Sequence, residues 1–156
     1  ELQEEVNQIT ADLIKAQLAE VGVEVTIEKY TLSELSEIIK TRDYDMLLYG
    51  QSLGYNLDTF AYWHSSQVSE TGLNLSNYKN PNADVLIEKI RSTFDLAEKQ
   101  SFLEDLGATL ADDVPAVFLY TPSYYYVVDT KLTGVDFKKL LLLKDRFTTI
   151  GSWSFN

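Results

Sequence analysis

The residues best suited to chemistry gather around a single histidine. His64 is the only histidine in the sequence, Ser65 and Ser66 follow it directly, and Asp58 lies shortly before it. Serine, histidine and a carboxylate are the parts of a hydrolase triad, so a small hydrolase that uses His64 is one alternative. The arrangement is unfavourable, because neighbours in sequence rarely present a base to a nucleophile. The simpler interpretation is a loop histidine that packs and forms hydrogen bonds locally.

The other common kinds of chemical site are absent from the sequence. One histidine and no cysteine cannot build an ordinary zinc or iron centre. Asp43 and Asp45 lie two apart, but the glycine and the final glutamate of a calcium loop do not follow at the required spacing. The 7 glycines are scattered, so there is no phosphate-binding loop. We therefore expect no catalytic residue, no metal and no cofactor.

Composition and charge indicate one globular domain with an acidic surface. The chain has 156 residues, 45% of them hydrophobic, which is enough to bury a core. Its formal net charge of -11 repels phosphate groups, so we expect no nucleic-acid partner. Apolar runs such as Leu140 to Leu143 are too short to span a bilayer. No leader sequence is visible, and Glu1 opens directly into a helical pattern, so we expect the chain to be a fragment.

The spacing of apolar residues predicts helices that alternate with strands. Apolar residues recur at helical spacing over 2–21, 33–40, 83–94 and 97–110. Alternating or continuous apolar residues predict strands at 23–27, 45–49, 116–120 and 124–128, with the second and third strands buried and the last two paired as a hairpin. This order is typical of an α/β layer.

Local signals predict where these helices begin and end. Thr31 or Ser33 is expected to cap the second helix, and Asp95 the fourth. Gly22 is expected to end the first helix, and the Val114–Pro115 pair the last.

The segment 51–80 is the strongest candidate for a binding surface. It lacks sustained periodicity and is rich in glycine, amide and aromatic residues. Long irregular segments of this kind are often functional, with aromatic rings supplying contact area and amides supplying orientation. Each aromatic can equally belong to a small satellite core that pins the loop. A second alternative is a stand-alone interaction module that docks another protein through this loop.

Several short motifs along nearly the whole chain resemble those of one protein family. The first is L-x-x-x-G-V-x-V at 18–25, which is similar to the family's L-x-x-x-G-I-x-V. The others, in order, are a strand ending at Gly50, Asp58 with Phe60 and Trp63–Ser66, G-x-N from Gly72, Tyr78 followed by N-P-x-x-D from Asn80, D-x-P from Asp113 and L-x-G from Leu132. In this order the motifs resemble the C-terminal lobe of bacterial extracellular solute-binding proteins of family 5, the substrate-binding proteins of peptide and nickel ABC transporters.

The resemblance implies both a fold and a function. It implies one lobe of a type II periplasmic-binding-protein fold, with a central mixed sheet flanked by helices. Residues 1–156 would be a single domain whose larger N-terminal part is absent. The function implied is capture of oligopeptides, or a similar small solute, and delivery to the permease subunits of an ABC importer. The implied location is extracytoplasmic, either periplasmic or lipid-anchored.

The residues that follow the strand at 45–49 are the predicted ligand-binding site. In an open α/β sheet, ligands bind outside the carboxyl ends of the strands. The expected ligand-binding residues are Gly50, Gln51, Ser52, Leu53, Gly54, Tyr55, Asn56 and Asp58. An extended peptide can pair there main chain to main chain. We expect Trp63 to anchor the loop, and His64 to line the cleft or anchor the loop.

The same stretch departs from the family pattern. Peptide-binding members often carry G-W-x-x-D, in which the aspartate pairs with the α-amine of the peptide. Here Gln51 stands at the tryptophan position and Gly54 at or near the aspartate position. A ligand ammonium would then need another partner, either Asp58 or a residue of the missing lobe.

Overall fold

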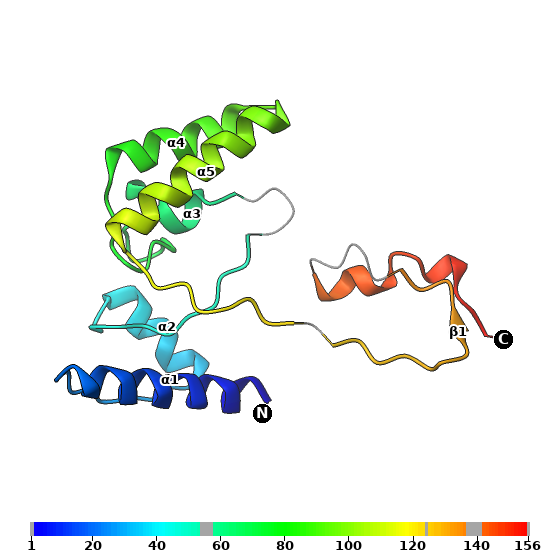
Figure 1. The fold of residues 1–156 in the computed structure, drawn as a ribbon, viewed down its shortest axis with the longest axis horizontal. Coiled ribbons are helices and arrows are strands. Elements are labelled where there is room, and N and C mark those ends of the chain that lie inside the picture. The colour runs from blue at the N-terminus through cyan, green and yellow to red at the C-terminus, as the bar shows by residue number, and fades with distance from the viewer. Residues whose placement is uncertain (1, 54–57, 124, 137–141, 156) are drawn as a thin grey trace.

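The computed structural model describes residues 2–53, 58–123, 125–136 and 142–155, and in these residues the fold is mainly helical. The helices are α1 (Leu2–Glu20), α2 (Leu32–Thr41), α3 (Phe60–Trp63), α4 (Pro81–Ser92) and α5 (Leu96–Asp113), with the short 3-10 helices η1 (Ser65–Gln67), η2 (Leu143–Phe147) and η3 (Ile150–Ser152). Figure 1 shows α3, α4 and α5 together at one end, α1 and α2 at the other, and the residues from β1 onward standing apart. Among the described helices, none is long and apolar enough to cross a lipid bilayer.

The core lies between α4 and α5, which form a helical hairpin with α3 packed beside α4. Ala83, Ile87 and Ile90 of α4 are almost completely buried, because their spacing puts all three on one face of the helix. Leu106 and Leu110 of α5 complete this layer one turn apart from each other. Helices α3, α4 and α5 therefore form the part of the described chain with a closed hydrophobic core.

The predicted capping and terminating residues of the helices are confirmed, although the helix predicted at 83–94 runs from 81 to 92. The Thr31 hydroxyl caps α2 by accepting a hydrogen bond from the Glu34 N–H, and the Glu34 carboxylate accepts one from the Thr31 N–H. Asp95 caps α5 through its side-chain oxygen. Gly22 (φ 82°) and Val114 (φ 48°) end their helices in the left-handed region. These boundaries are local features that a sequence carries directly.

The predicted central mixed sheet is not formed in the described residues. The segments 23–27, 45–49, 116–120 and the described part of 124–128 run without strand pairing. The strand pair that is described consists of β1 (Leu132–Thr133) and β2 (Ser154–Phe155), antiparallel to each other. A pattern of strand-forming residues shows only what suits a half-buried surface, whereas a ladder also needs a second backbone at hydrogen-bonding distance.

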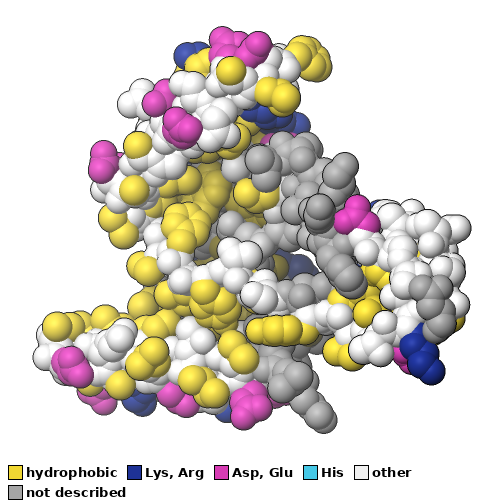
Figure 2. Space-filling model, turned by 45° about the vertical axis from the view of Figure 1, so that its right-hand side comes forward, with side chains coloured by type: hydrophobic (Ala, Val, Ile, Leu, Met, Phe, Trp, Pro, Cys, Tyr) yellow, Lys and Arg dark blue, Asp and Glu magenta, His cyan; other side chains and the backbone are white. Residues whose placement is uncertain are grey.

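The prediction that 45–49 and 116–120 are buried is also wrong. Met46 and Val117 are 59% and 75% exposed, and Phe118 is 68% exposed. Figure 2 shows hydrophobic side chains gathered on the surface between the α4–α5 end of the molecule and α1. Contiguous apolar surface of this kind is typical of an interaction face.

The L-x-G motif near the C-terminal end has a steric explanation. Gly134 has a φ of 80° and lies so close to the chain before β2 that a Cβ would sit 2.1 Å from the carbonyl oxygen of Ser152. Only glycine fits there without displacing the backbone. The glycine therefore fixes how the chain leaves β1.

Candidate functional site

The predicted ligand-binding segment begins with accessible main chain. Gly50, Gln51 and Ser52 are exposed and Leu53 is half-buried. The predicted ligand-binding residues Gly54, Tyr55 and Asn56 lie outside the described residues. The described part of the candidate site is therefore the stretch 50–53, together with Asp58 and the helix that follows it.

Tyr62 connects this segment to the helical core. Its hydroxyl donates a 2.9 Å hydrogen bond to the carbonyl oxygen of Ser52. Its ring packs against the buried cluster that contains Trp63 and Ile87. The position of Ser52 is thus set by a side chain whose ring is held by the core.

Asp58 is held on both of its carboxylate oxygens. Oδ1 accepts the Phe60 N–H at 3.1 Å, and Oδ2 lies 3.4 Å from Nε of Arg91. The Arg91 guanidinium also covers the Phe60 ring, 4.3 Å from its centroid. These contacts favour a positioning role for Asp58 at the start of α3. Direct contact of Asp58 with a ligand stays a prediction.

Trp63 occupies the position of an anchor. Its side chain is only 5% exposed and belongs to the α3–α5 core. Its ring makes edge contacts with Tyr78 (6.4 Å between centroids) and Phe118 (5.8 Å). This burial agrees with the loop-anchoring role expected for Trp63.

His64 is tied into its own turn. Its ring stacks on Phe60 with centroids 4.3 Å apart. Nδ1 accepts the Ser66 N–H at 3.1 Å and lies 2.8 Å from the Ser66 hydroxyl oxygen, which makes His64 the cap of η1. Nε2 lies 3.6 Å from Glu88 and 3.9 Å from Asp84. His64 therefore packs and hydrogen-bonds locally, as the simpler interpretation predicted.

Asn74 organises the loop that follows η1, a role that sequence reasoning missed. It is completely buried, and its Nδ2 donates to the carbonyl oxygens of His64 (3.2 Å) and Tyr78 (2.8 Å). Its Oδ1 accepts the Tyr78 N–H at 3.0 Å. The sequence marks Asn74 only as the last residue of the G-x-N motif. Its function as a hydrogen-bond hub appears only once the loop is folded.

A second missed feature joins α2 to the same loop. Arg42 donates from Nη2 to the carbonyl oxygens of Ser69 (3.0 Å) and Gly72 (2.8 Å). Tyr44 donates to the carbonyl oxygen of Leu75 at 2.6 Å. Gly72 also lets the loop fold back on itself, since a Cβ there would lie 1.9 Å from the carbonyl oxygen of Gln67. Arg42 and Tyr44 are 27 to 31 residues away from these carbonyl groups, so a local sequence pattern does not predict the contacts.

One polar cluster joins the start of α4 to the end of α5. Tyr78 donates its hydroxyl to Oδ2 of Asp113, and Asn80 donates to the same oxygen at 2.6 Å. Burial and the Asp113 carboxylate raise the pKa of Tyr78 to about 12. The hydrogen bonds from Tyr78 and Asn80 in turn lower the pKa of Asp113. Both shifts favour a protonated Tyr78 that donates to an ionised Asp113, so this hydrogen-bonded cluster stabilises the contact between the two helices.

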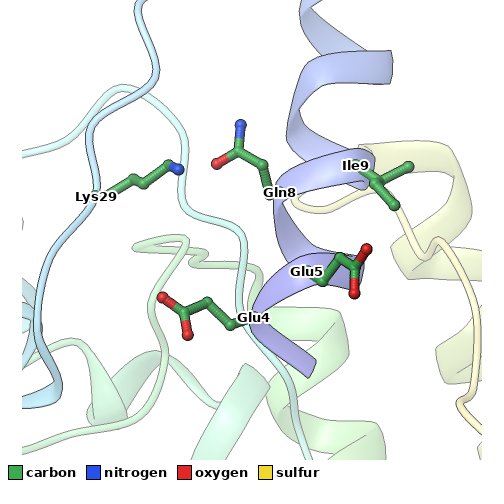
Figure 3. A pocket seen from close by; sticks show the side chains of 5 residues that line it. All are labelled: Glu4, Glu5, Gln8, Ile9 and Lys29. Atoms are coloured by element: carbon green, nitrogen blue, oxygen red, sulfur yellow. The ribbon is translucent and has the colours of Figure 1, made fainter. Parts of the chain in front are cut away.

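A hollow beside α1 is separate from the candidate site. It is a shallow depression of about 340 Å³, open to solvent and lined by Glu4, Glu5, Gln8, Ile9 and Lys29. Figure 3 shows Lys29 and Gln8 reaching toward each other across it. None of the predicted ligand-binding residues lines this hollow. In the described part of the chain, no group of three acidic or histidine side chains is arranged to hold a metal ion.

The comparisons with known proteins bear on the family of the chain. No protein-family model matches the chain. The oligopeptide-binding protein AppA of Bacillus subtilis (strain 168) is 31% identical over 131 residues, which cover 83% of this chain and 24% of AppA. The solved structure of AppA in complex with a nonapeptide matches with a TM-score of 0.73 and 28% identity, over 97% of this chain and 30% of that one.

The chain is therefore homologous to part of an oligopeptide-binding protein, and its resemblance to the family 5 extracellular solute-binding proteins is confirmed. The protein it resembles is a binding protein by name and not an enzyme. The match also supports the type II periplasmic-binding-protein fold class, although the described residues contain only a small sheet. The chain spans only about a quarter of the curated relative, at 24% of its length.

Proposed function

We propose that this chain is the C-terminal ligand-binding lobe of the substrate-binding component of an ABC importer. The complete protein would capture oligopeptides outside the cytoplasmic membrane and deliver them to the permease subunits. The observation that carries the proposal is the structural match to AppA, whose solved structure holds a nonapeptide. The protein would work in the periplasm or from a lipid anchor on the outer face of the membrane.

In this proposal, the segment 50–53 binds the peptide main chain. Gly50, Gln51 and Ser52 are exposed, so their backbone groups are accessible to an extended ligand. Main-chain pairing of this kind ignores most side-chain identities, which gives a tolerant peptide receptor. Gln51 would add a side-chain amide that can both donate to and accept from a peptide group.

The partner of the ligand's α-ammonium group would lie on the N-terminal lobe. The Asp58 carboxylate already accepts the Phe60 N–H and pairs with Arg91. Using it for a ligand would require breaking contacts that hold the start of α3. A carboxylate on the opposite lobe would close the cleft over the ligand without that cost.

The apolar surface of the chain supports the assignment to one lobe of a larger protein. Met46, Tyr49, Val117, Phe118 and Tyr120 are each at least 47% exposed. A soluble two-lobed protein would cover this surface with the rest of its chain. Two lobes that close around a ligand by hinge motion also divide the contacts between them. The isolated chain would therefore bind a peptide weakly, because it meets the entropy cost of capture with part of the contacts.

The first test is native mass spectrometry of the complete protein purified gently from its host. Peptide capture predicts a spread of added masses that match short peptides, and a single discrete mass would instead indicate a dedicated small solute. Calorimetry with a recovered peptide should then show weaker binding for Gln51→Ala and Tyr55→Ala, with folding unchanged. Gln8→Ala, in the hollow beside α1, is the matched control and should bind like the unmodified protein. Unchanged affinity in both site variants would contradict the site assignment.

A further inference from the structure

We propose that Tyr62 and Arg91 are positioning residues that fix the ligand-contacting segment before a peptide arrives. The inference rests on the proposed function, because it concerns the same segment, 50–53. Neither residue is predicted to touch the ligand. Tyr62 ties the segment itself to the core of α3, α4 and α5, and Arg91 ties Asp58, the first described residue after the segment, to the same core.

The first tether starts from the core and ends on the main chain of the site. The ring of Tyr62 is partly buried against the core cluster, while its hydroxyl reaches the carbonyl oxygen of Ser52 at 2.9 Å. A hydrogen bond to a carbonyl fixes the orientation of the peptide plane that carries it. The adjacent backbone groups of Gln51 and Leu53 are then presented in one direction.

The second tether comes from the last turn of α4. Arg91 pairs with Asp58 at 3.4 Å and stacks on Phe60 at 4.3 Å. The Asp58 carboxylate in turn accepts the N–H of Phe60, the first residue of α3, at 3.1 Å. Arg91 thereby fixes the residue at which the chain re-enters the helical core after the site.

The two tethers therefore hold Ser52, within the segment 50–53, and Asp58, the first described residue after it. Ser52 is fixed to α3, and Asp58 is fixed to α3 and α4. The Arg91 and Asp58 side chains are 50% and 31% exposed, and a pair this open contributes little to global stability. Its use is better explained by preorganisation, since a segment already held in its bound geometry loses less entropy on binding.

The test uses the complete protein with Tyr62→Phe and Arg91→Met. The first change removes only a hydroxyl, and the second removes the charge but keeps an apolar chain to lie on Phe60. Each should raise Kd about three- to tenfold, which is the range of one lost hydrogen bond. The rise should be equal for two nonapeptides of unrelated sequence that the unmodified protein binds. The unfolding midpoint of both variants should stay unchanged. Arg91→Lys, which keeps the charge, should bind more tightly than Arg91→Met.

Two control variants remove similar groups elsewhere. Tyr78→Phe deletes a hydroxyl that donates to Asp113. Lys89→Met deletes a cation of α4, the helix that also carries Arg91; this cation lies over the Phe102 ring. Neither touches the segment 50–53, so both should retain the original Kd. If the controls weaken binding as much as the tether variants do, positioning by Tyr62 and Arg91 is refuted.

Hydrogen exchange without ligand separates this inference from the proposed function. Both tether variants should speed amide exchange in 50–53 and leave exchange in α5 unchanged. If the unmodified protein binds no peptide, the proposed function fails while this readout still tests the tethers. Unchanged exchange in 50–53 for both variants would overturn the positioning role, whatever the ligand proves to be.

Discussion

Two regions of the molecule handle their apolar residues in opposite ways. In the helical body, residues 58–113, the side chains of Ile87 and Ile90 are at most 1% exposed. In the open segments, defined as residues 45–53 and 116–123, Met46 and Val117 are 59% and 75% exposed. The open segments are at least as hydrophobic in sequence as the helical body, so hydrophobicity alone does not decide burial. The presence of a packing partner within the same chain decides it.

The contrast assigns different tasks to the two regions. The helical body closes its own core, because α4 and α5 are adjacent in sequence and pair through a short turn. The open segments present strand-like main chain and apolar side chains that only a further surface can cover. Substitutions in the helical body should therefore change stability, and those in the open segments should change association.

The largest expected effect is on Ile87, at the centre of the core. Ile87 is completely buried, so Ile87→Ala should leave a cavity and lower the free energy of unfolding by about 2–5 kcal/mol. Urea unfolding followed by tryptophan fluorescence measures this. Val85→Ala on the same helix is the control, since Val85 is 50% exposed. Similar losses for both variants would mean that the helical body has no specific core.

A smaller loss is expected from the buried amide of Asn74. Asn74→Ala would remove the acceptor of the Tyr78 N–H and the donor to two carbonyl oxygens. Leaving such groups buried without partners should cost about 1–3 kcal/mol of unfolding free energy. Asn82→Ala, at an exposed position of α4, should be nearly neutral in the same urea experiment. A neutral Asn74→Ala would show that water replaces the lost bonds.

The Tyr78–Asp113 pair should make the stability of the helical body depend on pH at both extremes. The pKa of Asp113 is lowered by bonds from Tyr78 and Asn80, so its contribution is present above the ordinary aspartate pKa and is lost as pH falls through the folded value. The pKa of Tyr78 is raised to about 12, mainly by burial, so its contribution is present below 10 and is lost as pH rises toward 12.

Tyr78→Phe tests this dependence directly. It should remove the loss between pH 10 and 12 and weaken the loss in acid, because one of the bonds to Asp113 disappears. The measurement is the urea midpoint across pH, with Tyr62→Phe as a tyrosine control that keeps the Asp113 bond. If the urea midpoint of Tyr78→Phe still falls between pH 10 and 12, a group other than Tyr78 causes the loss of stability.

The smallest stability effect is expected in the open segments. Val117→Ser should change the free energy of unfolding of this chain by no more than about 0.5 kcal/mol, since the side chain is 75% exposed. The same change should reduce self-association of the chain, as measured by sedimentation. In the complete protein it should be clearly destabilising, if the other lobe covers this surface. A large loss already in the isolated chain would mean that Val117 has a partner within it.

The helices and their caps could be predicted from the sequence because their causes are local. Thr31 meets Glu34 within one turn, and Asp95 bonds the amides directly after it. The burial of Trp63 agrees with the loop-anchoring role predicted for it. The order of short motifs identified the family, since it carries information that no single motif holds.

The strands and the inner contacts of the site could not be predicted in the same way. The segments at 45–49 and 116–120 have strand-like patterns, but no pattern specifies whether a second backbone lies beside them. Asp58 could be named as a site residue, but its ion pair with Arg91 joins residues that are far apart in the sequence. The same is true of Arg42 and its carbonyl partners.

By itself, the sequence determined the helices, their ends, the absence of thiolate and phosphate-loop chemistry, and the resemblance to solute-binding proteins. The tertiary structure decided that Asp58 faces Arg91, that Tyr62 holds Ser52 and that Asn74 is the centre of its loop. The physical reason is the range of the interactions. Helix caps and hydrophobic periodicity act within a few residues, whereas burial and side-chain pairing depend on which distant surfaces meet when the chain packs.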